Sequence, residues 1–330
     1  MQSFRTPRPT TNPYIAMLDR ALAAEPGVVH LTFSWPRALL TRVDVLHLHW
    51  PEVLLEGDRA WKRLGKRMLL RMLLLKLAVT RAAVVRTAHN IELPADADVP
   101  TRRLLEAVER AAVHRIVLNP LTRLPWSSPA TVIPHGHYRD WFAPHPHQTA
   151  VPGRIGYFGL IRRYKGVETL LAAYAEASAD DRLSLRIGGK PSSVELADGI
   201  TTSIAGVPRA SATLRFLTDA ELVDIATSSQ VIALPYRFMH NSGGALAALS
   251  LNRPVLVPRN EVNTALAAEV GPGWVHQFDG EIAAADLTAA VAATEALSGE
   301  PDLSAREWAD VGRRHAEVYR AALDDRRARA

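Results

Sequence analysis

Short apolar, β-branched runs alternate with longer stretches of helical periodicity along the whole chain. In the first half we expect strands at 28–33, 43–49, 83–89, 115–118 and 130–133, and helices at 13–24, 59–77 and 101–112. In the second half we expect strands at 154–158, 183–188, 214–216, 231–234 and 254–258, and helices at 167–177, 219–228, 243–251, 283–297 and 304–323. This alternation predicts an α/β protein with parallel sheets covered by helices.

A proline-containing stretch divides this pattern near the middle of the chain. Residues 142–153 contain three prolines and little periodicity, and a length of 330 residues suggests two domains. We therefore predict two Rossmann-like domains, 1–145 and 146–330, with the C-terminal helix free to pack back on the first. Open parallel sheets bind ligands beyond the carboxyl ends of their strands, so two such domains facing each other would form a central cleft.

The composition excludes several kinds of site. The chain has no cysteine, which excludes a disulfide scaffold, a thiol nucleophile and cysteine-ligated metals. The first thirteen residues hold Arg5, Arg8 and three prolines but no apolar run, so we expect no cleaved export signal and a cytoplasmic location.

Positive charge is concentrated in the first half, although the net charge is only +5. Residues 59–86 carry nine Lys and Arg side chains, no acid, and many leucines. The cations interrupt every window long enough to span a bilayer. Such a segment can form a basic amphipathic helix on an anionic membrane, here the inner face of the plasma membrane, or a half-buried helix with a solvated basic face. Nucleic acid is not an expected partner, because no aromatic stacking pattern or helix-turn-helix signal is present.

A basic turn joins a strand to a helix in the second half. Between Gly159 and Gly166 the chain places Arg162, Arg163 and Lys165, just before the helix begins. Guanidinium and ammonium groups bind phosphate oxygens, and a helix N-terminus adds partial positive charge. The turn therefore predicts an anion site, and a solvated basic loop is the alternative.

A second glycine motif follows the strand at 231–234. Tyr236 is followed by a polar loop ending in Asn241, and the run 242–244 (Ser-Gly-Gly) then opens an apolar helix. The backbone amides at the start of a helix can bind a phosphate, and glycines there leave room for it to approach. The sequence has no P-loop motif, so a site of that kind is not expected. A capped helix that contacts no ligand is the alternative. Gly188, next to Gly189, is a weaker third candidate.

Histidines and one carboxylate gather at the expected strand ends of the first half. His47 and His49 alternate with apolar residues, Glu52 follows them, and His89 ends another strand. A third region holds His135 and His137. A metal site of His47, His49 and His89 is conceivable, but no metal-binding spacing supports it and we predict none. Asp96 and Asp98 are interpreted as loop and helix-cap residues.

These motifs, in this order, resemble the GT-B glycosyltransferases of the family 4 superfamily, and within it the xanthan-type mannosyltransferases of bacterial exopolysaccharide synthesis. The residues that carry the resemblance are the basic turn 159–166, Pro235–Tyr236 with Ser242–Gly243–Gly244, the run 87–90 (Thr-Ala-His-Asn) and the strand start at 253–255. The resemblance covers nearly the whole chain. It implies that the C-terminal domain binds a nucleotide-sugar and the N-terminal domain binds the acceptor.

The resemblance also implies roles for single residues. Arg162 or Arg163, together with Lys165, would neutralise the donor diphosphate, and the backbone at 242–244 would hold it. His89 matches the histidine that approaches the donor sugar in the family. Tyr236, Asn241 and Gly188 complete the predicted donor site.

The sequence departs from the family pattern in two places. Retaining members carry two glutamates eight positions apart, where this chain has Met239 and Ala247. The Gly-Arg-Leu turn of the family reads Gly159–Leu160–Ile161 here, with the arginines displaced to 162 and 163. The missing glutamates favour an inverting reaction.

The resulting hypothesis is a hexosyltransferase that needs no metal or cofactor. It moves a sugar, with mannose from GDP-mannose favoured by the resemblance, to a glycan or polyprenyl-linked acceptor. Glu52 is the first choice for the general base, and His49 and His89 are the alternatives. Two other functions stay open: a non-catalytic nucleotide- or glycan-binding homologue that regulates a partner, and a GT-B-shaped sugar epimerase.

Overall fold

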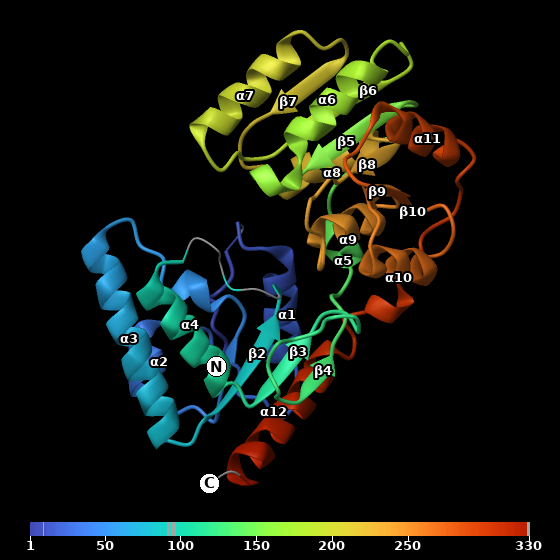
Figure 1. Cartoon of the computed structure of the whole chain (residues 1–330). Coiled ribbons are helices and arrows are strands. Elements are labelled where there is room, and N and C mark those ends of the chain that lie inside the picture. Colours follow the sequence, from blue (N-terminus) through green and yellow to red (C-terminus); the bar gives the residue numbers. More distant parts are fainter. Residues whose placement is uncertain (9, 91–92, 94–96, 329–330) are drawn as a thin grey trace. The chain divides into compact units, whose positions relative to one another are not determined.

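The computed structural model describes residues 1–8, 10–90, 93 and 97–328. The chain forms two compact units, Met1–Gly136 with Glu307–Ala330, and His137–Arg306 (Figure 1). The first unit is left after Gly136 and re-entered at Glu307. The stretch 142–153, which we expected to link two domains, therefore lies inside the second unit.

The first unit is built on a parallel sheet in the order β1-β2-β3-β4. Its strands are β1 (Val45–Leu48), β2 (Ala83–Ala88), β3 (His114–Val117) and β4 (Ala130–Val132). The strand expected at 28–33 is wrong. Two backbone hydrogen bonds join these residues to the N-terminal segment, Gln2 N–H to Leu31 O and Phe33 N–H to Phe4 O, both 2.8 Å. Two such bonds are too few to form a strand.

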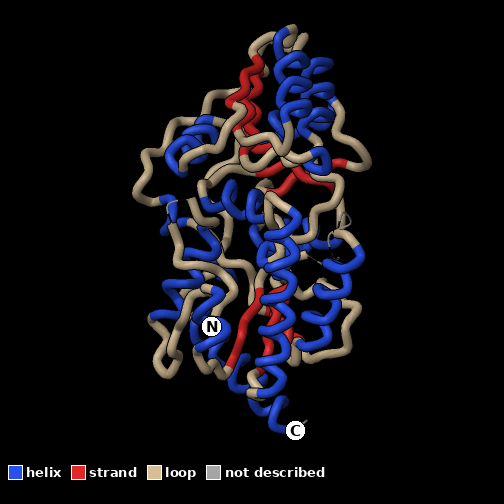
Figure 2. Tube along the Cα trace, turned by 90° about the vertical axis from the view of Figure 1, so that its left-hand side faces the viewer, coloured by secondary structure: helices blue, strands red, loops and turns tan. Residues whose placement is uncertain are grey.

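Helices cover both faces of this sheet. They are α1 (Pro13–Ala23), α2 (Trp35–Leu40), the 3₁₀ turn η1 (Pro51–Leu54), α3 (Ala60–Val79), α4 (Val99–Ala111) and α12 (Val311–Ala328). Leu46, Leu48 and Val84 share one buried core with residues of α3 and α4. The alternate positions on β1 and β2 face α12, which runs along the sheet in Figure 2.

The second unit holds a parallel sheet in the order β10-β9-β8-β5-β6-β7. Its strands are β5 (Arg154–Phe158), β6 (Ser184–Gly188), β7 (Ala210–Thr213), β8 (Val231–Ala233), β9 (Val255–Pro258) and β10 (Val275–Phe278). Its helices are α5 (Arg139–Phe142), η2 (Arg163–Lys165), α6 (Val167–Ala177), α7 (Val194–Ala205), α8 (Asp219–Ser228), α9 (Gly243–Ser250), α10 (Glu261–Val270), α11 (Ala284–Thr294) and η3 (Ser304–Arg306).

The two parallel sheets and their helices confirm the expected α/β class. The strand expected at 214–216 lies a few residues earlier, at β7, and the last helix begins at Val311 rather than 304. The periodicity did not indicate α2, α7, α10 or β10. Asp98 is the N-cap of α4, where its carboxylate accepts a 3.0 Å bond from Thr101 N–H, and Asp96 lies outside the described residues.

Candidate active site

Three glycine-containing segments of the second unit meet at the carboxyl ends of neighbouring strands. The turn after β5 is held to the segment after β6 by Gly159 N–H to Gly188 O, 3.0 Å, and Ile161 N–H to Lys190 O, 2.9 Å. It is held to the segment after β8 by Arg237 N–H to Tyr164 O, 2.8 Å. The structure thus brings the three segments together at the carboxyl edge of the sheet. This is where parallel sheets bind ligands.

Gly166 allows the basic turn to pack closely against the segment after β8. Its backbone is left-handed, with φ of 68°, and a Cβ atom there would lie 2.2 Å from the carbonyl oxygen of Pro235. Any other residue would strain the backbone and push the two segments apart. The glycine therefore fixes where the cations just before it are placed.

The three cations of this turn lie in different surroundings. Lys165 is half-buried, with its ammonium 4.8 Å from the ring centroid of Tyr236. Burial, with a smaller contribution from the charge of Arg162, lowers the pKa of Lys165 to about 8. Arg163 is 73% exposed and lies 3.7 Å from Glu168. Lys165 is therefore the cation that an incoming anion would stabilise most.

The Ser-Gly-Gly motif forms the N-terminus of α9. Ser242 is the N-cap and accepts a 3.1 Å bond from Ala245 N–H. Gly243 and Gly244, the first helical residues, have amides with no partner within the helix. A Cβ on Gly244 would come within 3.2 Å of the Tyr236 hydroxyl, so the small residue lets the tyrosine approach the helix end.

Two other residues predicted to bind the nucleotide-sugar donor, Gly188 and Asn241, lie in surroundings unlike those of Lys165 and Gly244. Gly188 is buried, and a Cβ there would lie 2.3 Å from Ile225 Cδ1, so this glycine packs against the core and supports Gly159 through its carbonyl. Asn241 is half-buried in the loop before Ser242. Direct contact of either residue with a donor stays a prediction.

Buried apolar side chains occupy the two positions at which retaining members of the family carry glutamates. Met239 is 7% exposed and Ala247 is 6% exposed. The Met239 carbonyl accepts a 3.0 Å bond from Asn260 Nδ2, which ties its loop to the N-cap of α10. Neither position offers a carboxylate that could act as a nucleophile.

The first unit contains a buried network of hydrogen-bonded side chains next to β1 and β2. His89 Nε2 lies 3.2 Å from His49 Nδ1, and His49 Nε2 lies 3.0 Å from Gln2 Oε1. Gln2 donates to the Tyr319 hydroxyl at 2.8 Å, and that hydroxyl lies 2.8 Å from His47 Nδ1. The pattern at the strand ends predicted His49 and His89. It offered no signal for Gln2 or for Tyr319, which comes from α12.

Burial sets the charge state of these histidines. It lowers the pKa of His47, His49 and His89 well below the usual value, and neighbouring positive charge lowers each further. They are neutral near pH 7, so each carries one donor and one acceptor nitrogen. His89 also stacks on Trp50, with ring centroids 3.8 Å apart. Within the described residues, no group of three or more His, Cys, Asp or Glu side chains could hold a metal ion.

Glu52 lies on η1, four residues after the end of β1. The side chain is half-buried, and desolvation raises its pKa, while the nearby Arg86 charge opposes this shift. A carboxylate with a raised pKa is a stronger proton acceptor near neutral pH. Glu52 therefore has the chemistry of a general base, a role that also stays open for His49 and His89.

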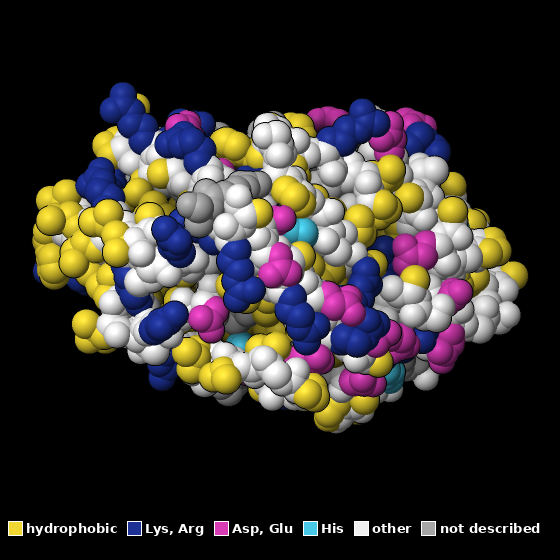
Figure 3. Space-filling model, turned by 90° about the horizontal axis from the view of Figure 1, so that it is seen from below, with side chains coloured by type: hydrophobic (Ala, Val, Ile, Leu, Met, Phe, Trp, Pro, Cys, Tyr) yellow, Lys and Arg dark blue, Asp and Glu magenta, His cyan; other side chains and the backbone are white. Residues whose placement is uncertain are grey.

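Helix α3 exposes an apolar stripe to solvent. Its members recur every three or four residues and are 55% or more exposed: Trp61, Leu64, Met68, Met72, Leu75 and Val79. In Figure 3 hydrophobic side chains gather over α3 at the left edge of the view, next to Lys and Arg. One cation of the basic segment does not belong to this surface, because Arg86 is buried with its Nε 3.0 Å from Glu109. Among the described helices none is long and apolar enough to cross a membrane.

Known proteins resemble this chain along nearly its full length. Two relatives from Xanthomonas campestris pv. campestris, both named GDP-mannose:glycolipid 4-beta-D-mannosyltransferase, are 43% identical over 326 residues, 97% of this chain and 91% of theirs. The chain belongs to the family of these glycosyltransferases. No family model matches it.

Solved structures show the fold of this glycosyltransferase. Anabaena HepE, in complex with UDP and glucose, has a TM-score of 0.63 and 13% identity, covering 97% of this chain and 98% of its own. Sucrose-phosphate synthase from Thermosynechococcus elongatus has a TM-score of 0.58 and 14% identity, covering 98% and 94%. Both confirm the expected GT-B fold, and the family confirms an enzyme. The comparisons give no support to a non-catalytic binding homologue.

Proposed function

We propose that this glycosyltransferase moves mannose from GDP-mannose to a sugar hydroxyl of a glycolipid, with inversion and without a metal ion. The 43% identity to two mannosyltransferases supports the donor and the acceptor class. The observation that carries the proposal is that Lys165 and the N-terminus of α9 both lie next to Tyr236, with the ammonium 4.8 Å from its ring and Gly244 beside its hydroxyl. A diphosphate bound there would meet the Lys165 ammonium, the Arg162 guanidinium and the first amides of α9.

In the proposed reaction the acceptor oxygen attacks the anomeric carbon of mannose as the bond to the diphosphate oxygen breaks. The acceptor proton passes to Glu52, and the electron pair leaves with GDP. Lys165, Arg162 and the amides of Gly243 and Gly244 stabilise the charge that develops on the diphosphate. The apolar side chains at positions 239 and 247 support a single displacement, since no carboxylate is available there.

The α3 surface supports a membrane-bound acceptor. An exposed apolar stripe flanked by cations fits the boundary between acyl chains and anionic headgroups. We propose that α3 attaches the enzyme to the cytoplasmic face of the plasma membrane, where a polyprenyl-linked glycan would be available.

The test is transfer of radiolabelled mannose from GDP-mannose to a glycolipid extract, with UDP-glucose and ADP-glucose as donor controls. We expect label in the lipid fraction from GDP-mannose alone, a β-linkage by NMR, and unchanged rates in EDTA. Donor binding with no product, or product retaining the nucleotide, would contradict the proposed transfer. Label in an α-linkage would contradict inversion, and loss of activity in EDTA would contradict metal independence.

A further inference from the structure

The buried network next to β1 and β2 runs without a break from His89 to Thr87. Hydrogen bonds of 2.7–3.2 Å join its polar groups in the order His89 Nε2, His49 Nδ1 and Nε2, Gln2 Oε1 and Nε2, the Tyr319 hydroxyl, His47 Nδ1 and Nε2, and Thr87 Oγ1. All of these residues are 9% or less exposed. Their burial keeps bulk water from competing for the bonds.

The Gln2 amide sets the direction of the bonds in this network. An imidazole or a hydroxyl can donate or accept at a given atom, because a neutral ring exchanges tautomers and a hydroxyl rotates. The two ends of an amide differ, since its oxygen only accepts and its nitrogen only donates. Gln2 Nε2 donates to the Tyr319 hydroxyl at 2.8 Å, and Gln2 Oε1 lies 3.0 Å from His49 Nε2. His49 Nε2 therefore carries the ring proton.

The other tautomers follow from this one. A pKa well below the usual value keeps each of the three rings neutral near pH 7, so each ring carries one proton. His49 Nδ1 is then an acceptor, and His89 Nε2 donates to it at 3.2 Å. His89 Nδ1 is the unprotonated nitrogen of its ring. On the far side of Gln2, the Tyr319 hydroxyl donates to His47 Nδ1 at 2.8 Å.

Packing holds the rings in place, whereas the hydrogen bonds select the tautomer. His89 stacks on Trp50, with ring centroids 3.8 Å apart, and meets Tyr14 edge to face at 5.3 Å. His49 packs on Phe4, with ring centroids 5.4 Å apart. These apolar contacts fix the ring planes but do not distinguish one ring nitrogen from the other.

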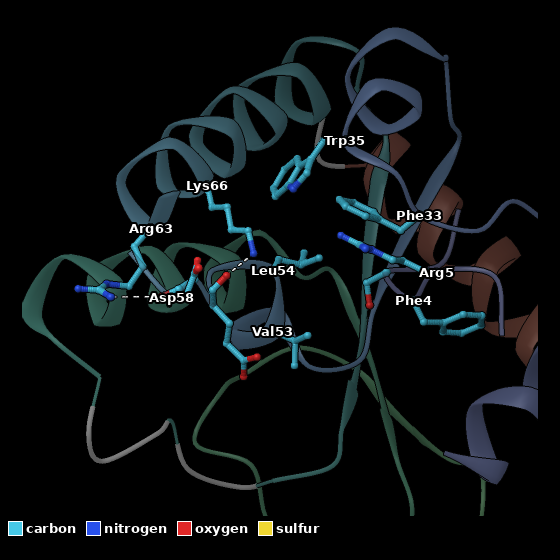
Figure 4. A pocket seen from close by; sticks show the side chains of 12 residues that line it. Phe4, Arg5, Phe33, Trp35, Val53, Leu54, Asp58, Arg63 and Lys66 are labelled. Carbon is cyan, nitrogen blue, oxygen red and sulfur yellow. Dashed lines mark hydrogen bonds between the residues drawn. The ribbon is translucent and has the colours of Figure 1, made fainter. Parts of the chain in front are cut away.

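Pairing with β1 places Gln2 in the network. Gln2 forms a parallel bridge with His47, and Ser3 N–H donates to the His47 carbonyl at 2.8 Å. The Gln2 side chain is buried on the inner side of this N-terminal segment. Figure 4 shows the residues that follow it at a separate groove of about 860 Å³, whose lining includes Phe4, Arg5, Trp35 and Lys66. Gln2 does not line that groove, so its polar contacts lie within the network.

We propose that Gln2 and Tyr319 are positioning residues that hold His89 in the tautomer with its proton on Nε2. In this tautomer His89 meets a substrate hydroxyl as an acceptor, through Nδ1. His49 is not the general base, because both of its ring nitrogens are engaged within the network. The proposal rests on the proposed function only in assigning a substrate to His89.

The test reads the tautomers directly, in the full-length protein without ligand. Isotope-labelled histidine is incorporated, and long-range proton–nitrogen correlation spectra at pH 7 distinguish protonated from unprotonated ring nitrogens. We expect the proton on Nε2 in His47, His49 and His89. His315 is an internal control for the opposite tautomer, because its Nδ1 donates to the Val311 carbonyl at 2.7 Å. A proton on Nδ1 of His49 or His89 in the wild type would overturn the proposal.

A matched pair of tyrosine variants tests the hydroxyl. Tyr319→Phe keeps the ring but leaves the Gln2 Nε2 donor without its partner, which favours rotation of the amide. We expect part of the His89 population to move its proton to Nδ1, although two residues separate Tyr319 from His89 in the network. Tyr14→Phe is the control and should leave the tautomer unchanged, because the Tyr14 ring packs on His89 while its hydroxyl lies outside the network.

A second variant reaches the same proton by another route. Gln2→Leu removes both ends of the amide, so His49 Nε2 loses its acceptor and the His89 tautomer should again become mixed. His89 keeping its wild-type tautomer in either Tyr319→Phe or Gln2→Leu would show that packing alone sets it, and the proposal would be wrong.

Transfer assays connect the tautomer to the reaction and separate the two proposals. Tyr319→Phe should lower kcat/KM for mannose transfer about two- to tenfold, the size of one hydrogen bond. A changed tautomer with unchanged transfer would overturn the positioning role. Mannose transfer by a wild-type protein with the opposite tautomers would refute this proposal alone. The expected tautomers in a protein that transfers no mannose would refute the proposed function alone.

Discussion

Replacing Lys165 by Met should weaken the binding of GDP while stabilising the protein without ligand. Burial lowers the lysine pKa from 10.5 to about 8, so the folded state holds this charge unfavourably. A shift of this size corresponds to roughly 3 kcal/mol. The stability gain expected for Lys165→Met is smaller, about 1–2 kcal/mol, because the lysine is partly exposed to solvent and because the variant loses its interaction with the Tyr236 ring. A charged hydrogen bond to phosphate is worth about 1.5–3 kcal/mol, so GDP affinity should fall about 10- to 150-fold.

The pH dependence follows from the sign of the shift. Because the folded-state pKa lies below the unfolded value, the destabilisation is complete below pH 8 and fades as the pH rises toward 10.5. The stability gain of Lys165→Met should therefore be largest at pH 7 and shrink by pH 10. In the wild type, GDP affinity should fall above pH 8 as the ammonium loses its proton.

Differential scanning fluorimetry with and without GDP, at pH 7, 9 and 10, measures both effects. Arg182→Gln is the matched control, because it removes an exposed cation of the second unit that pairs with Asp180 at 2.8 Å. GDP affinity within twofold of the wild type in Lys165→Met would refute the diphosphate assignment. A lower melting temperature for the unliganded variant would refute the burial penalty.

Three further predictions concern other parts of the chain. Glu52→Gln should abolish mannose transfer and leave the GDP-induced rise in melting temperature unchanged; surviving transfer would place the base elsewhere. Gly166→Ala should destabilise the protein by about 1–3 kcal/mol in chemical denaturation, from backbone strain and the clash with Pro235, and an unchanged midpoint would contradict this packing. Met68→Gln with Met72→Gln should reduce sedimentation with anionic vesicles roughly 30-fold, at about 1 kcal/mol of lost burial per side chain, and equal sedimentation would contradict attachment through α3.

Much of the second unit could be predicted because its signals are local. The expected bounds of β5, α6 and α8 match the structure residue for residue. β5 is a short run that is buried almost throughout, and α6 buries a face with the helical period. The two helices also have clear starts, Gly166 before α6 and the Thr218 cap before α8. The basic turn and the Ser-Gly-Gly helix start could be recognised for the same reason. Each is defined by glycines and polar or charged residues that lie close together in the sequence, just after a predicted strand.

The histidine chain of the first unit could be predicted only in part. His47, His49 and His89 lie at strand ends, where the alternation of β1 predicts a shared face. Tyr319 is 272 residues from His47 and reaches it only because α12 packs back on the first sheet.

Taken alone, the sequence determined the α/β class, the two sheets and the chemistry at their strand ends, because these follow from periodicity and from residue types close together in the chain. Only the tertiary structure decided which cations are exposed and which are buried, as Arg86 is against Glu109. It also decided that Arg5, Trp35 and Lys66 line one groove. The reason is physical: charge, burial and contact depend on neighbours brought in from distant parts of the chain, and no local pattern records them.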